Sequence, residues 1–251
     1  MKYELLKIDN YEICKVNFVL DEQMIKTAYS QAEAKSPFTN IHNPAAKKRT
    51  NLEVFNAQLL GTIADIACSN LLKQYMDKYS PKQFTVQRYD DIRINQYQKP
   101  DLFDTEIVCA GNEIKLLEIE IRSSVCNKMP ISAMLKKWHI LGWYVSQNKL
   151  IEEVKDFYMR PIYHYKKFHT SPTYFLKDAI KHLEDGNLDL YIVGGASSDI
   201  LKEFGEIQQG FGLLQDGATY QVVSIKKGLQ IRLLLEEIRN FCVLKERGLD
   251  N

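Results

Sequence analysis

Hydrophobic residues follow two different periods along the chain. Between Leu52 and Leu72 they recur with the spacing of an amphipathic helix, and Ser80-Pro81 ends the pattern. Asn51 is the N-cap expected from residue type. Segments 103–109 and 114–122 instead alternate apolar and polar residues, with Ala110-Gly111-Asn112-Glu113 between them. The pattern therefore predicts a long helix followed by a β-hairpin.

The rest of the chain alternates between strand and helix patterns. Strands are expected within 4–19 and at 156–163, 188–193 and 220–225; helices are expected at 21–34, 131–145, 175–183, 197–207 and 229–244. Pro161 favours a sheet edge or a bulge in its strand. This order predicts an α/β fold with a mixed β-sheet flanked by helices. We expect a single domain over residues 1–251, in which 1–50 is an N-terminal extension to the core.

Composition excludes some classes of protein. The chain of 251 residues is 45% hydrophobic and 26% charged, which is typical of a globular domain. It carries five cysteines without CxxC spacing, so the sequence supports neither a structural zinc site nor a complete set of disulfides. Its first residues lack the apolar h-region of a signal peptide, and it has no run of ~20 apolar residues, so we expect a cytoplasmic protein without a membrane partner. The absence of a GxSxG motif argues against acyl-transfer chemistry.

The net charge of +1 excludes strong attraction of nucleic acid by the protein as a whole. Any contact with nucleic acid would therefore be made by local clusters of basic residues. The two main clusters are Lys47-Lys48-Arg49 and Lys136-Lys137. A solvated surface explains clusters this short, and contact with DNA phosphates is the functional alternative.

The predicted hairpin concentrates acidic residues. Alternation in its second strand separates the apolar side chains from the charged ones, which are Glu118, Glu120 and Arg122. A three-residue turn at 111–113 would pair Asp104 in the first strand with Glu120 in the second. Two carboxylates about 5 Å apart repel each other unless a cation lies between them. Carboxylate oxygens are ligands that suit Mg²⁺, so the pair indicates a magnesium site. The structural alternative is that these acids lie on an ordinary solvated strand face.

These strands resemble the core of the PD-(D/E)xK, or restriction-endonuclease-like, nuclease superfamily. The resemblance covers roughly residues 51–124 and rests on Leu102-Phe103-Asp104-Thr105-Glu106-Ile107 and Leu117-Glu118-Ile119-Glu120-Ile121-Arg122-Ser123-Ser124. In that family an Asp on one strand and the Glu of an E-x-K on the next bind Mg²⁺. The preceding helix often carries a further acid, for which Leu60-Gly61-Thr62-Ile63-Ala64-Asp65 supplies Asp65, with Glu53 as a second candidate.

The sequence departs from the family pattern at two places. Arg122 stands where Lys is usual, and Arg stays charged near pH 7, so it can hold a phosphate but cannot act as a general base. Alternatively, Glu118 and Glu120 form an E-x-E variant of the motif. The first acid is also ambiguous because Pro100-Asp101 is a literal "PD"; Asp104 is preferred because it falls within the predicted strand.

The resemblance implies a restriction-endonuclease-like core and a Mg²⁺-dependent DNA endonuclease, of which a type II restriction enzyme acting as a homodimer is one form. It assigns Asp104, Glu120 and Glu118 to the metal, Arg122 to the scissile phosphate, and Asp65 or Glu53 to the outer ligand shell. The resemblance would place the helix with Lys136 and Lys137 near DNA. The alternatives are a catalytically inactive DNA-binding or regulatory protein of the same fold, and an α/β interaction protein whose acidic strand faces solvent.

Overall fold

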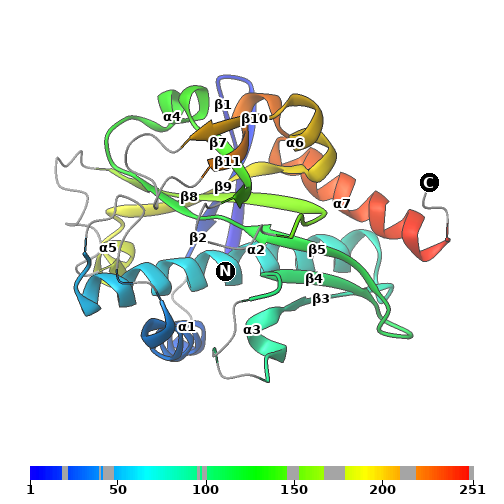
Figure 1. Ribbon diagram of the computed structural model, residues 1–251, viewed down its shortest axis with the longest axis horizontal. Coiled ribbons are helices and arrows are strands. Elements are labelled where there is room, and N and C mark those ends of the chain that lie inside the picture. The colour runs from blue at the N-terminus through cyan, green and yellow to red at the C-terminus, as the bar shows by residue number, and fades with distance from the viewer. Residues whose placement is uncertain are drawn as a thin grey trace.

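The computed structural model describes residues 1–18, 22–39, 41, 48–94, 97, 101–145, 153–166, 179–209 and 219–248. Within these residues the chain forms a mixed β-sheet with helices against it, as the sequence predicts (Figure 1). All five cysteines are buried and unpaired. No helix in these ranges combines the length and the apolar character needed to cross a membrane.

The larger sheet has the strand order β1-β2-β9-β8-β5-β4-β3, with the short strand β6 also paired to β8. Its pairs are antiparallel, except that β5 and β6 both run parallel to β8. The strands are β1 (Lys2–Ile8), β2 (Tyr11–Asn17), β3 (Phe84–Arg88), β4 (Thr105–Cys109), β5 (Lys115–Ile121), β6 (Ser124–Cys126), β8 (Phe157–Tyr165) and β9 (Leu188–Ser197). The first two strands thus extend the sheet that carries the predicted hairpin.

One face of this sheet is covered by long helices. The helices α2 (Asn51–Tyr79) and α7 (Ile231–Glu246) lie against its strands, and α1 (Glu22–Lys35) packs on α2. The short helices α3 (Tyr89–Ile92) and α5 (Ala179–Glu184) lie nearer the ends of the sheet (Figure 1). The hydroxyl of Tyr163 on β8 donates to the carbonyl of Leu60 on α2 at 2.7 Å. Ser69 on α2 and Thr105 on β4 share a buried hydrogen bond of 2.6 Å. These contacts fix α2 across the sheet beside the start of β4.

A second sheet covers part of the opposite face. Its order is β10-β11-β7, formed by β7 (His139–Val145), β10 (Glu206–Gln209) and β11 (Thr219–Ser224) and accompanied by α4 (Ile131–Lys137) and α6 (Ser198–Phe204). Successive residues of β8 alternate between the two layers: Phe157 and Met159 join the core under α2, whereas Tyr158 packs with the smaller sheet. The larger sheet is therefore buried on both faces in its centre.

Two predicted helices are shorter than the sequence pattern indicates. The helix expected at 131–145 ends at Lys137, and residues 139–145 form β7 because they pair with β11. The helix expected at 197–207 ends at Phe204, and β10 begins at Glu206. Gly205 permits this tight junction, since a Cβ there would lie 2.1 Å from the carbonyl oxygen of Leu201. Distant strand partners thus override local helical periodicity at both sites.

The bulge expected at Pro161 is confirmed. The register between β8 and β9 shifts between Met159 and Pro161, and β8 lies inside the sheet rather than at its edge. The bulge accommodates a residue that has no backbone N–H to donate.

Thr50, and not Asn51, is the N-cap of α2. The Thr50 hydroxyl accepts a hydrogen bond from the Glu53 backbone N–H at 3.2 Å, and the Glu53 carboxylate accepts one from the Thr50 backbone N–H at 2.7 Å. This reciprocal pair is a capping box, which satisfies two backbone donors at the start of the helix. Asn51 instead occupies the first helical position and is exposed.

Thr50→Ala is therefore expected to lower the free energy of unfolding by about 1 kcal/mol. Urea denaturation followed by circular dichroism measures the change. Asn51→Ala is the matched control and should leave stability within about 0.5 kcal/mol, because an exposed residue away from such features contributes little. A larger loss from Asn51→Ala than from Thr50→Ala would contradict the assignment of the cap.

The register of the central hairpin is as the sequence predicts at the acidic end, although its turn is different. Thr105 pairs with Ile119 and Glu106 with Glu118, so the same register continued by one residue sets Asp104 opposite Glu120. The connection spans residues 110–113, as the alternation of the two segments predicts, rather than the three-residue turn at 111–113 from which the pairing was derived, and a bulge after Ile107 compensates for the extra residue. Asp104 itself lies just before β4 rather than inside it.

Candidate active site

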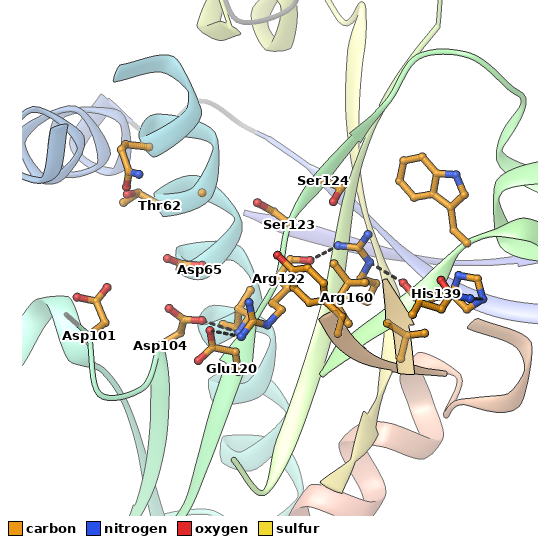
Figure 2. A pocket seen from close by; sticks show the side chains of 18 of the residues that line it. Thr62, Asp65, Asp101, Asp104, Glu120, Arg122, Ser123, Ser124, His139 and Arg160 are labelled. Carbon is orange, nitrogen blue, oxygen red and sulfur yellow. Dashed lines mark hydrogen bonds and ion pairs between the residues drawn. The ribbon is translucent and has the colours of Figure 1, made fainter. Parts of the chain in front are cut away.

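A cleft of about 920 Å³ opens where α2 and the ends of β4 and β5 approach the smaller sheet (Figure 2). Its two walls differ in chemistry. One wall carries the carboxylates Asp65, Asp101, Asp104 and Glu120. The other carries basic, aromatic and amide side chains, namely Lys137, Trp138, His139, Arg160, Gln208 and Tyr220. The cleft therefore has an acidic wall facing a wall of basic, aromatic and amide groups.

Asp104 is held by the strand that faces it. The backbone N–H of Ile121 donates a hydrogen bond to Oδ2 of Asp104 at 2.5 Å. Burial raises the pKa of Asp104 above its ordinary value, although this hydrogen bond and the nearby Lys35 and Arg122 act in the opposite direction. The carboxyl group is thus fixed in position and sensitive to any additional positive charge.

Asp65 enters the same cleft from the middle of α2. Its side chain is buried, and its pKa is raised well above the ordinary value. Burial is the largest cause and the charge of Asp104 the next, whereas the charges of Lys35 and Arg88 act in the opposite direction. Among the described residues, neither a hydrogen-bond donor nor an ion-pair partner contacts its carboxylate. A buried carboxylate without a partner costs free energy unless a proton or a cation compensates it.

Glu120 and Arg122 complete the acidic end of the cleft. Nη2 of Arg122 lies 3.4 Å from Oε1 of Glu120, and both side chains remain partly accessible. Figure 2 shows Asp65, Asp104 and Glu120 approaching one another from α2, the loop before β4, and β5. The structure therefore brings together three of the acids that the sequence selects.

Lys35 is a cleft residue that the sequence does not single out. It ends α1, and its Nζ lies 2.7 Å from Asp90 and 3.4 Å from Asp101. Burial lowers its pKa, but the carboxylates of Asp65, Asp90 and Asp104 together raise it above the ordinary value. Its role depends on the packing of α1 against α2, for which a single helix end gives no sequence signal.

Asp101, the acid of the literal "PD", also lines the cleft. It forms ion pairs with Lys35 and with Arg93. Because two cations already compensate this carboxylate, it is a poorer candidate for a metal ligand than Asp65 or Asp104.

Glu118 lies away from the cleft. It forms ion pairs with Lys115 at 2.6 Å and with Lys155 at 2.9 Å. Burial opposes ionisation, but the hydrogen bonds from these two lysines hold the pKa of Glu118 below its ordinary value. The E-x-E alternative therefore does not place both of its acids in one site. Glu53 is likewise occupied by the capping box of α2 and does not line the cleft.

The basic clusters divide in the same way. Lys47 lies outside the described residues, Lys48 is exposed and Arg49 is half-buried, and neither of the last two lines the cleft. Lys136 forms an ion pair with Asp9 at 2.7 Å on the surface. Lys137, its neighbour in sequence, lines the cleft and is exposed.

Comparisons with known proteins leave the family open. No protein-family model matches the chain, and no solved structure matches it. The chain is 27% identical over 236 residues to an uncharacterized protein of Methanocaldococcus jannaschii. The aligned region covers 86% of this chain and 82% of that protein. The fold and the site thus define an α/β protein with an acidic cleft, and the similarity extends over most of its length.

Proposed function

We propose that the protein is a metal-dependent endonuclease that hydrolyses phosphodiester bonds in DNA. The observation that carries the proposal is the convergence of Asp65, Asp104 and Glu120 from three separate elements on one cleft. One acid lies before a strand, a second lies opposite it on the next strand, and a third lies on the preceding long helix. The resemblance to PD-(D/E)xK nucleases implies this arrangement of acids, which supports the proposal.

The proposed cofactor is Mg²⁺. The described residues contain no cluster of three or more His, Cys, Asp or Glu side chains already arranged as metal ligands. The chemistry of the cleft nevertheless fits the ion, because Asp65 is buried without a partner and the pKa values of Asp65 and Asp104 are both raised. Asp65, Asp104 and Glu120 would hold the ion through oxygen atoms, with water and phosphate completing its shell. When bound, it lowers the pKa of a coordinated water and offsets charge at the phosphorus.

Basic residues of the cleft have a separate task in this proposal. The guanidinium of Arg122 presents two donors to the non-bridging oxygens of the attacked phosphate, and its ion pair with Glu120 orients it. Lys35 stays protonated because its pKa is raised, so it contributes positive charge rather than a base. Cleavage of both strands would use two copies of the site in a homodimer, as in a type II restriction enzyme.

Incubation of the protein with supercoiled plasmid tests the proposal. Nicked or linear DNA should accumulate with Mg²⁺ and not with EDTA. Absence of cleavage together with salt-sensitive DNA binding would instead support a catalytically inactive DNA-binding protein. That second candidate is favoured by one observation, the Arg at the position of the family's lysine.

Lys137 and Lys136 provide a matched test of DNA contact. Lys137→Gln is expected to weaken binding and to reduce the slope of log K against log salt concentration by about one, because one phosphate contact is lost. Lys136→Gln should change neither quantity, since Lys136 lies outside the cleft and pairs with Asp9. Fluorescence anisotropy of a labelled duplex in EDTA measures both. Equal effects of the two substitutions would remove the cleft from the DNA-binding surface.

A further inference from the structure

Arg160 is the most deeply buried cation of the cleft outside the acidic end. It lies on β8, where two other strand ends meet, and its residue exposure is 4%. Nη1 donates to the carbonyl oxygen of Arg122 at 2.5 Å, and Nε donates to that of His139 at 3.0 Å. Its guanidinium also lies over the ring of Trp138, 5.9 Å from the centroid. Arg160 thus joins the end of β5 to the start of β7.

These contacts leave the charge of Arg160 uncompensated. Its partners are neutral carbonyl groups, and no carboxylate in the described ranges forms an ion pair with it. Nη2 has no hydrogen-bond acceptor among the same residues. Burial and then the charge of the neighbouring Arg122 lower the pKa of Arg160 to about 9, although Tyr220 acts in the opposite direction. The charge of Arg122 therefore adds to the cost of keeping Arg160 charged. A buried charge of this kind is normally paired, and an anionic ligand in the cleft would provide the pair.

The surroundings of Arg160 suit a phosphate group. Ser123 and Ser124 follow Arg122 at the break between β5 and β6, and both line the cleft. Lys137 lines it from the end of α4. An ion pair joins Glu120 to Arg122, and hydrogen bonds join Arg160 to the carbonyl oxygens of Arg122 and His139. Arg160 therefore lies beyond Arg122 as seen from the acids (Figure 2).

We propose that Arg160, with Ser123, Ser124 and Lys137, forms a second phosphate subsite, which binds a phosphodiester of the nucleic acid next to the one attacked. The inference rests on the proposed function for the identity of the ligand, but the site itself requires no cleavage. Arg160 then has two tasks: it holds two backbone carbonyls with Nη1 and Nε, and it offers Nη2 to a phosphate oxygen.

Tryptophan fluorescence tests the subsite without metal. The chain has two tryptophans, and Trp143→Phe leaves Trp138 beside Arg160 as the reporter. In EDTA, inorganic phosphate and a short single-stranded oligonucleotide should each change its emission in a saturable way, with the oligonucleotide binding more tightly. Arg160→Lys in the same background should weaken both affinities about tenfold, because a charge-assisted hydrogen bond is lost. Lys136→Gln should leave both unchanged.

Each outcome bears on the subsite separately from the enzyme. If Arg160→Lys fails to fold, as circular dichroism would show, the Trp143→Phe protein still shows whether phosphate and the oligonucleotide bind, because it retains Arg160. An emission that neither phosphate nor oligonucleotide changes would overturn the subsite, even if plasmid cleavage occurs. Phosphate binding without oligonucleotide binding would overturn the nucleic-acid assignment. Saturable binding of both ligands without any Mg²⁺-dependent cleavage would support the subsite and count against the endonuclease.

Discussion

Asp104→Asn is expected to lower the rate of Mg²⁺-dependent DNA cleavage about 1,000-fold. The substitution keeps the shape of the side chain, including an oxygen that can accept the hydrogen bond from the Ile121 backbone N–H. It removes the negative charge that the proposed metal site requires. Loss of several kcal/mol of electrostatic stabilisation in the transition state corresponds to an effect on the order of 1,000-fold. Glu120→Gln should lower the rate by a similar factor, and initial rates on supercoiled plasmid measure both.

Glu118→Gln is the matched control on the same strand. Glu118 lies two residues from Glu120 but pairs with Lys115 and Lys155 outside the cleft. Its substitution should leave the cleavage rate within about threefold of the unmodified protein, since no transition-state contact is lost. Thermal unfolding of the same samples separates a change in rate from a loss of folded protein. Inactivation by Glu118→Gln with the fold intact would restore the E-x-E alternative and contradict the site as the cleft defines it.

Asp65→Asn is expected to stabilise the protein at neutral pH in EDTA. The folded-state pKa of Asp65 is raised, first by burial and then by Asp104, so the folded state holds the proton more tightly than the unfolded chain does. The unfavourable contribution of Asp65 therefore begins near the ordinary aspartate pKa and grows as the pH rises to the raised folded-state value. Removal of this ionisable group should raise the free energy of unfolding by about 2 kcal/mol, or the midpoint of thermal unfolding by roughly 4–8 °C.

Calorimetry at two pH values and with Mg²⁺ checks this sign. Below the ordinary aspartate pKa both proteins carry a neutral group at position 65, so their midpoints should converge. Mg²⁺ should raise the midpoint of the unmodified protein at neutral pH and have a smaller effect on Asp65→Asn, because a ligand that binds the folded state stabilises it. An Asp65→Asn protein that is less stable at neutral pH in EDTA would show that the carboxylate is compensated within the folded chain.

Local pattern predicted the elements whose hydrophobic side chains select one period. The helix α2 and the helix α7 appear where the 3.6-residue spacing places them, and the alternating segments before and after residues 110–113 form β4 and β5. Residues 139–145 were predicted wrongly because their apolar residues suit either period. Their strand partner β11 begins more than seventy residues further along the chain, so no local signal identifies it.

For the candidate site, the sequence by itself determined the pairing that brings Asp104 opposite Glu120, because side-chain alternation and register in a hairpin are local properties. It left open whether Asp65 or Glu53 accompanies them and whether Glu118 belongs to the site. The tertiary structure decided which of these acids line the cleft: α2 carries Asp65 to it, whereas the capping box holds Glu53, and Lys155 engages Glu118 elsewhere. Lys35 lines the cleft for the same reason, because burial and charge pairing depend on which distant elements pack together, and spacing along one helix carries no record of that.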